Sequence, residues 1–148
     1  MKTLLRYGWI DSLPRAMDGK RSKLLLSPRK RGSAWSAVNK RIVGELIAEK
    51  SLHPSGQAAI NAAKADGSWS ALDEVEDGKL PDDLKKALDA NPPARKNFDA
   101  FPWSSRRGIL ERITLAKKAD TRAKRVQETA DLAGQNKRAL DWRAKQKA

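Results

Sequence analysis

The sequence lacks cysteine and has a single histidine among its 148 residues. Without cysteine the chain can form no disulfide, no thiolate metal site and no cysteine nucleophile. The single histidine, His53, cannot build a zinc site together with other histidines. Its position before Pro54 is typical of the start of a helix. We therefore expect neither a metal site nor a cofactor.

Aromatic residues and long apolar runs are also scarce. Five tryptophans, two phenylalanines and one tyrosine are the only aromatic residues, so we expect a small core built from Ala, Leu and Ile. No apolar run approaches the ~20 residues that span a bilayer, and the first residues lack the apolar stretch of a signal peptide. These features favour a cytoplasmic protein with no integral membrane segment.

The motifs of common enzymes are missing as well. The sequence has neither a GxGxxG pattern nor a P-loop, and the acidic cluster at 73–77 lacks the spacing of a calcium loop, so we expect a solvated loop there. Asp11 could act as a general base, but no second titratable residue that would complete an acid–base pair is evident. We favour a hydrogen-bonding role for Asp11 and a protein without catalytic residues.

Positive charge is the strongest compositional signal. The chain has 31 basic and 18 acidic side chains, a formal net charge of +13. Residues 1–32 carry +7, residues 33–90 carry −3 and residues 91–148 carry +9. Such a field attracts polyanions such as nucleic acid or an anionic surface, but it can also serve solubility alone. Because no base-reading motif is present, both interpretations stay open.

The first third of the chain predicts a β-hairpin. Residues 8–16 and 20–27 resemble two strands, and the Asp18-Gly19 dipeptide is typical of the turn between them. We expect the leucines at the end of the second strand to enter the core. Because a two-stranded hairpin alone is marginally stable in water, we expect it to be covered by the helix at 33–49, by further sequence or by a second copy in a homodimer.

Helices are predicted for the rest of the chain. Residues 33–49 have Ser33 as a plausible N-cap and an apolar stripe at helical spacing, formed by Trp35, Val38, Ile42, Val43, Leu46 and Ile47. Further helical patterns cover residues 53–67, 80–92, 93–101, 104–118 and 120–133. In the last three of these we expect Phe98 and Phe101 on one side of their helix, Ile109, Ile113 and Ala123 inward, and Asp120 as the cap of the last helix. The fold class is therefore α+β, with a short N-terminal β-hairpin followed by a mainly helical C-terminal half.

We divide the chain into three parts. Residues 1–79 hold the hairpin and the first helices, residues 80–134 form a helical C-terminal module, and residues 135–148 form a basic tail. The sequence contains no internal repeat.

Several stretches resemble the YdeI/OmpD-associated family of bacteriocin-protection proteins. They are "YGWIDS" at 7–12, "SPRKRGSAWSAVN" at 27–39, "LPDDLKKAL" at 80–88, "NPPARKNFDAF" at 91–101, "SSRRGIL" at 104–110 and "AKKADTRAKRV" at 116–126. The resemblance extends from residue 6 to about residue 133. It implies a cytoplasmic bacterial protein of stress tolerance, linked to bacteriocins or cationic antimicrobial peptides.

The chain departs from that family in two respects. Family members usually carry some tens of residues before the "YGWID" stretch, so we expect either a truncated N-terminal part or a misassigned start. Ile109 and Arg112 also stand where the family often has aromatic residues. The resemblance implies no catalytic residue.

We select candidate binding residues by charge and by neighbouring aromatic side chains. We interpret Trp35 as a core residue, and we expect Trp9 and Trp69 to be core residues as well. The basic run at 29–31 is expected to face solvent. The candidate residues are Arg29, Lys30, Arg31, Lys40, Arg122, Lys124, Arg125, Trp9 and Asp11.

Three functions remain possible from the sequence. The resemblance favours a non-enzymatic protein of bacteriocin tolerance, and the charge favours a protein that binds nucleic acid or an anionic surface. The third is an enzyme that acts on an anionic substrate through Asp11 and nearby arginines. A protein of this charge is a poor trap for a cationic peptide, so protection would act through a shared anionic target or a protein partner.

Overall fold

The structure is a computed structural model that describes residues 1–11 and 14–140. It has the expected α+β class, with a short β-hairpin near the N-terminus and helices in most of the remainder. The chain forms two compact units, Met1–Asp73 and Glu74–Ala148, which we call the N-terminal and C-terminal units. The expected basic tail at 135–148 lies partly outside the described residues.

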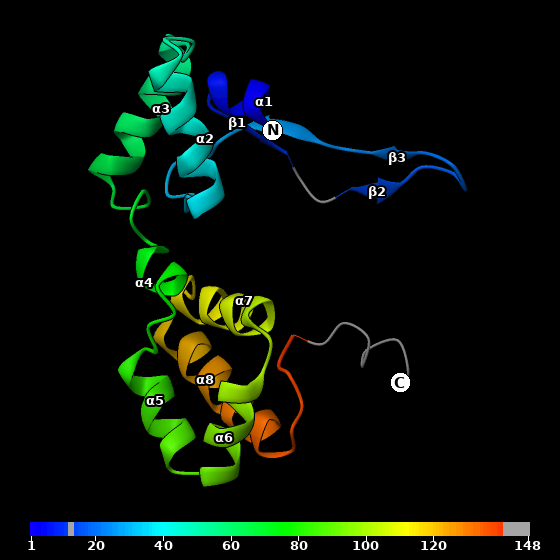
Figure 1. The fold of residues 1–148 in the computed structure, drawn as a ribbon, viewed down its shortest axis with the longest axis vertical. Helices are drawn as coiled ribbons and strands as arrows, with labels where there is room; N and C mark the ends of the chain where they lie inside the picture. The colour runs from blue at the N-terminus through cyan, green and yellow to red at the C-terminus, as the bar shows by residue number, and fades with distance from the viewer. Residues whose placement is uncertain (12–13, 141–148) are drawn as a thin grey trace. The chain divides into compact units, whose positions relative to one another are not determined.

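The N-terminal unit begins with a short helix that the sequence did not predict, α1 (Lys2–Arg6). The hairpin follows as four short strands, β1 (Trp9–Asp11), β2 (Arg15–Ala16), β3 (Ser22–Lys23) and β4 (Leu26–Pro28). Strand β1 pairs with β4 and β2 pairs with β3, both antiparallel. Figure 1 shows β2 and β3 as the distal part of this ribbon. The predicted hairpin is confirmed, with shorter and interrupted strands.

Two helices complete the N-terminal unit, α2 (Ala37–Ala48) and α3 (Pro54–Ala65). Helix α2 starts later than expected, because the Ser36 side chain, and not Ser33, accepts the hydrogen bond of the Asn39 amide. Helix α3 starts as expected. His53 caps it by accepting the Ser55 amide, and Pro54 takes the first helical position.

The core of the N-terminal unit lies where α1 packs against α2 and α3 (Figure 1). Glycine is required at residue 56, because a Cβ there would lie 2.2 Å from the Arg6 carbonyl oxygen. The close approach brings Leu5 into the core with Trp35, Val43, Leu46, Ile60 and Ala63.

Several residues of this unit that were expected in the core are exposed. Val38 and Ile47 of α2 are 55% and 52% exposed, because only the side of the helix that carries Val43 and Leu46 meets other elements. The predicted entry of the hairpin leucines into the core is also wrong: every residue from 14 to 26 is exposed. Trp69 is partly buried against the core.

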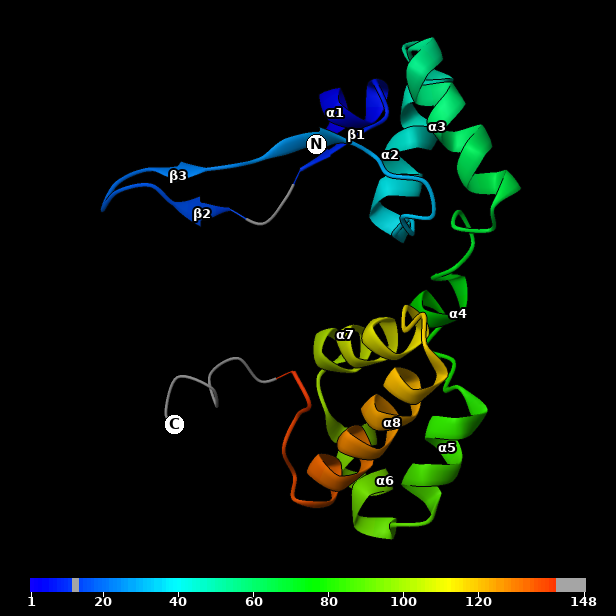
Figure 2. The same ribbon diagram turned by 180° about the vertical axis from the view of Figure 1, so that it is seen from behind.

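The C-terminal unit contains five helices in its described part, and the residues expected as a solvated acidic loop form the first of them. They are α4 (Asp73–Glu76), which spans the boundary between the units, α5 (Asp82–Asp89), α6 (Pro92–Ala100), α7 (Trp103–Thr114) and α8 (Ala119–Gly134). Helix α8 packs against α5, α6 and α7 (Figure 2).

The apolar residues of these helices form the second core. Phe98 and Phe101, which were expected on one side of their helix, are both buried, with ring centres 6.1 Å apart. Ile109 and Ile113 are also buried, but Ala123 is exposed where an inward position was expected. Asp120 lies in the first turn of α8, where a carboxylate suits the helix dipole, instead of capping it.

Candidate functional site

The outer part of the hairpin, residues 14–26, is the most exposed basic segment of the N-terminal unit, and we call it the basic hairpin. It carries Arg15, Lys20, Arg21 and Lys23 against one carboxylate, Asp18. Asp18 organises the turn, because its side chain accepts the amides of Lys20 and Arg21 and the Arg21 Nε–H. These bonds hold the pKa of Asp18 below its usual value, chiefly through Arg21.

Two cations face each other across the basic hairpin. Arg15 in β2 is the direct partner of Lys23 in β3. Side chains of directly opposite residues lie on the same face of a sheet, and like charges in that position destabilise the pair. An anion at this face would relieve the repulsion, so the arrangement is suited to contact with phosphate groups.

None of the candidate residues predicted from the sequence lies in the basic hairpin, but the corner that follows it, residues 29–35, holds three of them. The Arg29 guanidinium lies 4.0 Å from the centre of the Trp35 ring, and its Nη2 donates to the Ala34 carbonyl oxygen at 2.6 Å. Burial lowers the pKa of Arg29. The prediction that Arg29 faces solvent is therefore wrong, because the indole face and the loop carbonyls hold it. Lys30 and Arg31 are exposed, as expected.

A small cavity of about 120 Å³ lies between this corner and α3. Arg29 and Arg31 line it, but so does Asp66. Hydrogen bonds from Ser68 and from the Gly32 amide keep the pKa of Asp66 below its usual value, so its carboxylate is charged at neutral pH. The cavity thus holds its own anion, and we interpret the corner as structural.

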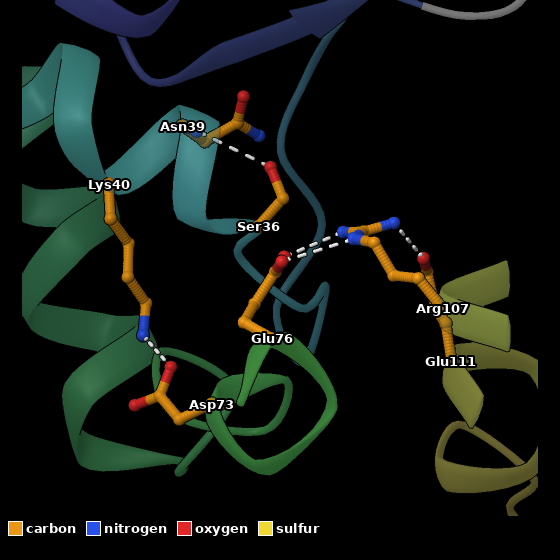
Figure 3. A network of polar contacts seen from close by, with 7 residues as sticks. All are labelled: Ser36, Asn39, Lys40, Asp73, Glu76, Arg107 and Glu111. Atoms are coloured by element: carbon orange, nitrogen blue, oxygen red, sulfur yellow. Dashed lines mark hydrogen bonds and ion pairs between the residues drawn. The ribbon is translucent and has the colours of Figure 1, made fainter. Parts of the chain in front are cut away.

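Lys40 also has a partner within the N-terminal unit. Its Nζ forms an ion pair with Asp73 (Figure 3) and lies 5.3 Å from the centre of the Trp69 ring. Four-fifths of its side chain is buried. Lys40 therefore has less freedom to contact a ligand than the cations of the basic hairpin.

Trp9 and Asp11 lie in β1, where they face Pro28 and Leu26 of β4. Trp9 is 39% exposed, so the prediction of a core position is wrong. Beside it, Thr3, Leu4, Tyr7 and Ser55 line a shallow, mostly apolar depression with Trp9. The base of the hairpin therefore presents aromatic surface to solvent.

The remaining predicted residues belong to α8 of the C-terminal unit. Arg122 forms two hydrogen bonds with Asp83, and Arg125 Nη1 donates to the Arg112 carbonyl oxygen. Lys124 is exposed. The nine candidate residues are thus distributed over both units, and the structure gives different environments to neighbours in sequence.

Sequence reasoning missed the ion-pair centre of the C-terminal unit. Arg107 on α7 donates to both oxygens of Glu76 and to Glu111 (Figure 3). The bond with Glu76 raises the pKa of Arg107. The i,i+4 spacing of Arg107 and Glu111 is a visible signal in the sequence, but the contact with Glu76 depends on tertiary packing.

Neither a metal nor a membrane span is indicated by the side chains the structure describes. Among residues 1–11 and 14–140, no three His, Asp or Glu side chains are grouped so as to hold a metal ion. Over the same residues no helix combines the length and apolar character needed to cross a bilayer.

Comparison with known protein families separates the two halves of the chain. Residues 77–136 match the family described as bacteriocin-protection, YdeI or OmpD-associated. The family resemblance is confirmed for this segment. Residues 1–59, which include the "YGWIDS" and "SPRKRG" stretches, match a different model, a domain of unknown function (DUF8412). No curated protein and no solved structure gives a significant match.

The bacteriocin-protection segment therefore corresponds to α5–α8 and their connections, and it contains Arg107 and Glu111 but begins one residue after Glu76. The basic hairpin lies in the other matched region. Association with bacteriocin protection holds at the level of the family.

Proposed function

We propose that this chain is a non-enzymatic, cytoplasmic polyanion-binding protein that contributes to tolerance of bacteriocins or cationic antimicrobial peptides. The observation that carries the proposal is the basic hairpin, where Arg15 faces Lys23 on an exposed ribbon. The family match of residues 77–136 supports the link to tolerance.

The mechanism follows from electrostatics. A chain of net charge +13 repels a cationic peptide and attracts the anionic targets of such a peptide. Protection then arises because the protein and the peptide compete for the same anionic groups. The contacts require phosphate charge and no base sequence, so affinity should fall steeply with salt.

The test compares two variants that each lose three positive charges. The first is Arg15→Ser with Lys20→Ser and Lys23→Ser in the basic hairpin. The second, the control, is Lys85→Ser with Lys86→Ser and Lys96→Ser, three exposed positions of the C-terminal unit. Binding to duplex DNA of mixed sequence is measured by fluorescence anisotropy over a range of salt concentrations.

We expect the hairpin variant to flatten the log–log salt dependence by about 2.7, since each phosphate contact contributes about 0.9. The control should keep the slope of the parent protein. Equal slopes for both variants would show that the hairpin makes no phosphate contacts. In cells, the hairpin variant should also lose protection against a cationic peptide while the control retains it.

A further inference from the structure

We propose that the basic hairpin docks on the surface of anionic phospholipid membranes, with its apolar side chains inserted between the headgroups. This inference rests on the polyanion binding proposed above and assigns the partner. Its basis is the occurrence of large exposed apolar side chains in the same short ribbon as the cations.

Four such side chains lie within or at the end of the basic hairpin. Met17 and Leu25 are 62% and 70% exposed, and Leu24 and Leu26 are also exposed. Met17 lies between Arg15 and Lys20 in the sequence, and the three leucines directly follow Lys23. Exposed apolar side chains contribute no burial free energy while they stay in water. A partner that removes them from water gains that free energy for the complex.

An anionic lipid surface satisfies both kinds of side chain at once. Lysine and arginine contact the headgroup phosphates, while leucine and methionine enter the acyl boundary a few ångströms deeper. Tyr7 and Trp9 at the base of the hairpin are partly exposed, and amphipathic aromatic rings of this kind favour the membrane–water interface.

Nucleic acid accounts for fewer of these features. It would engage the cations, but residues 14–26 contain no aromatic side chain that could stack on bases. Four apolar side chains would then stay in water, unless they wedge between base steps. The lipid surface is therefore the partner that the hairpin fits best.

The test separates apolar contacts from charge. Leu24→Ser with Leu25→Ser removes two apolar side chains from the hairpin and leaves every charge in place. The matched control is Val38→Ser with Ile47→Ser, two exposed apolar side chains of α2. Flotation with vesicles of phosphatidylglycerol and phosphatidylcholine, and with phosphatidylcholine alone, measures binding by the full chain. Duplex DNA is titrated in parallel, and circular dichroism verifies folding.

We expect the parent protein to float with the phosphatidylglycerol vesicles only. The leucine variant should lose about tenfold or more in vesicle affinity, while its DNA affinity and the vesicle affinity of the control stay within twofold of the parent. Vesicle binding that is unchanged in the leucine variant overturns the inference, as does an equal loss of DNA affinity. If the parent protein is a dimer and the leucine variant is a monomer, the hairpin serves self-association instead of lipid binding.

The outcome also distinguishes this inference from the function on which it rests. A parent protein that binds neither DNA nor vesicles contradicts both. Binding to DNA without binding to phosphatidylglycerol vesicles contradicts only the lipid partner.

Discussion

The two units of the chain place their basic residues in different environments. In the C-terminal unit Arg95, Arg107, Arg112 and Arg122 each reach a carboxylate on another helix. In the basic hairpin of the N-terminal unit, cations line an exposed ribbon and two of them face each other. The four arginines stabilise the packing of the C-terminal unit, whereas Arg15, Lys20 and Lys23 of the hairpin are exposed and available to a partner.

This difference shows that net charge alone does not locate a binding surface. Residues 91–148 carry a larger positive charge than residues 1–32. Four of their arginines, Arg95, Arg107, Arg112 and Arg122, are nevertheless paired with carboxylates on other helices of the same unit, and a surface ion pair leaves little net charge for a ligand. Exposure and pairing decide which cations can act, and both depend on the fold.

The largest expected effect tests the corner that separates the hairpin from α2. Trp35 is 2% exposed and lies under Arg29, with the Trp69 ring centre 5.1 Å away. Trp35→Ala should reduce the free energy of unfolding by about 3–5 kcal/mol. Hydrogen exchange of the N-terminal unit would measure it. Trp103→Ala, at an exposed tryptophan of the C-terminal unit, is the control and should cost far less.

An unchanged stability of the Trp35 variant would contradict the structural role of the corner. It would place the indole outside the core, where it could serve a ligand together with Arg29. The corner, like the hairpin, would then present its side chains to a ligand.

Much of the fold could be predicted because local signals agree with tertiary packing. The Asp18-Gly19 turn, the Pro54 helix start and the Phe98–Phe101 pair each follow from one short stretch of sequence. Helix α1 could not be predicted in this way. Its five residues are too short to show a period, and its place depends on contact with Gly56.

The candidate site was less predictable for a related reason. The sequence shows that Arg29, Lys30 and Arg31 are basic. Only the fold shows that the Arg29 guanidinium packs on the Trp35 ring. Leu24 and Leu25 matched a buried strand by composition, yet no element covers them among the described residues. An apolar run near many cations can therefore indicate a surface for a partner as well as a core strand.

The next effect contrasts a structural arginine with a hairpin lysine. Arg107 donates to Glu76 and Glu111, and its side chain is mostly buried. Arg107→Ala should cost about 1.5–3 kcal/mol of stability, the range for hydrogen bonds to charged groups, and leave the salt dependence of DNA binding unchanged. Lys20→Ser should do the reverse. Chemical denaturation and DNA titration of both variants measure the contrast, and two variants with similar profiles would refute it.

The smallest expected effect is a pH dependence confined to the C-terminal unit. Arg122 Nε lies 2.6 Å from Asp83 Oδ2, and Nη2 lies 3.0 Å from Oδ1. This hydrogen bonding lowers the pKa of Asp83. A carboxylate with a lowered folded pKa contributes stability above its unfolded pKa of about 3.9, and the contribution is lost as pH falls through the folded value. Because both side chains are partly exposed, it should stay below about 1 kcal/mol.

Asp83→Asn isolates this contribution, since asparagine keeps the shape but cannot ionise. At neutral pH the variant should be slightly less stable than the parent in urea unfolding. The two curves of stability against pH should converge as the pH falls below the folded pKa, where Asp83 of the parent is protonated. Parallel curves over this range would show that the Arg122 pair does not couple to folding. Arg122 would then contribute as little to the stability of its unit as an exposed cation of the hairpin does.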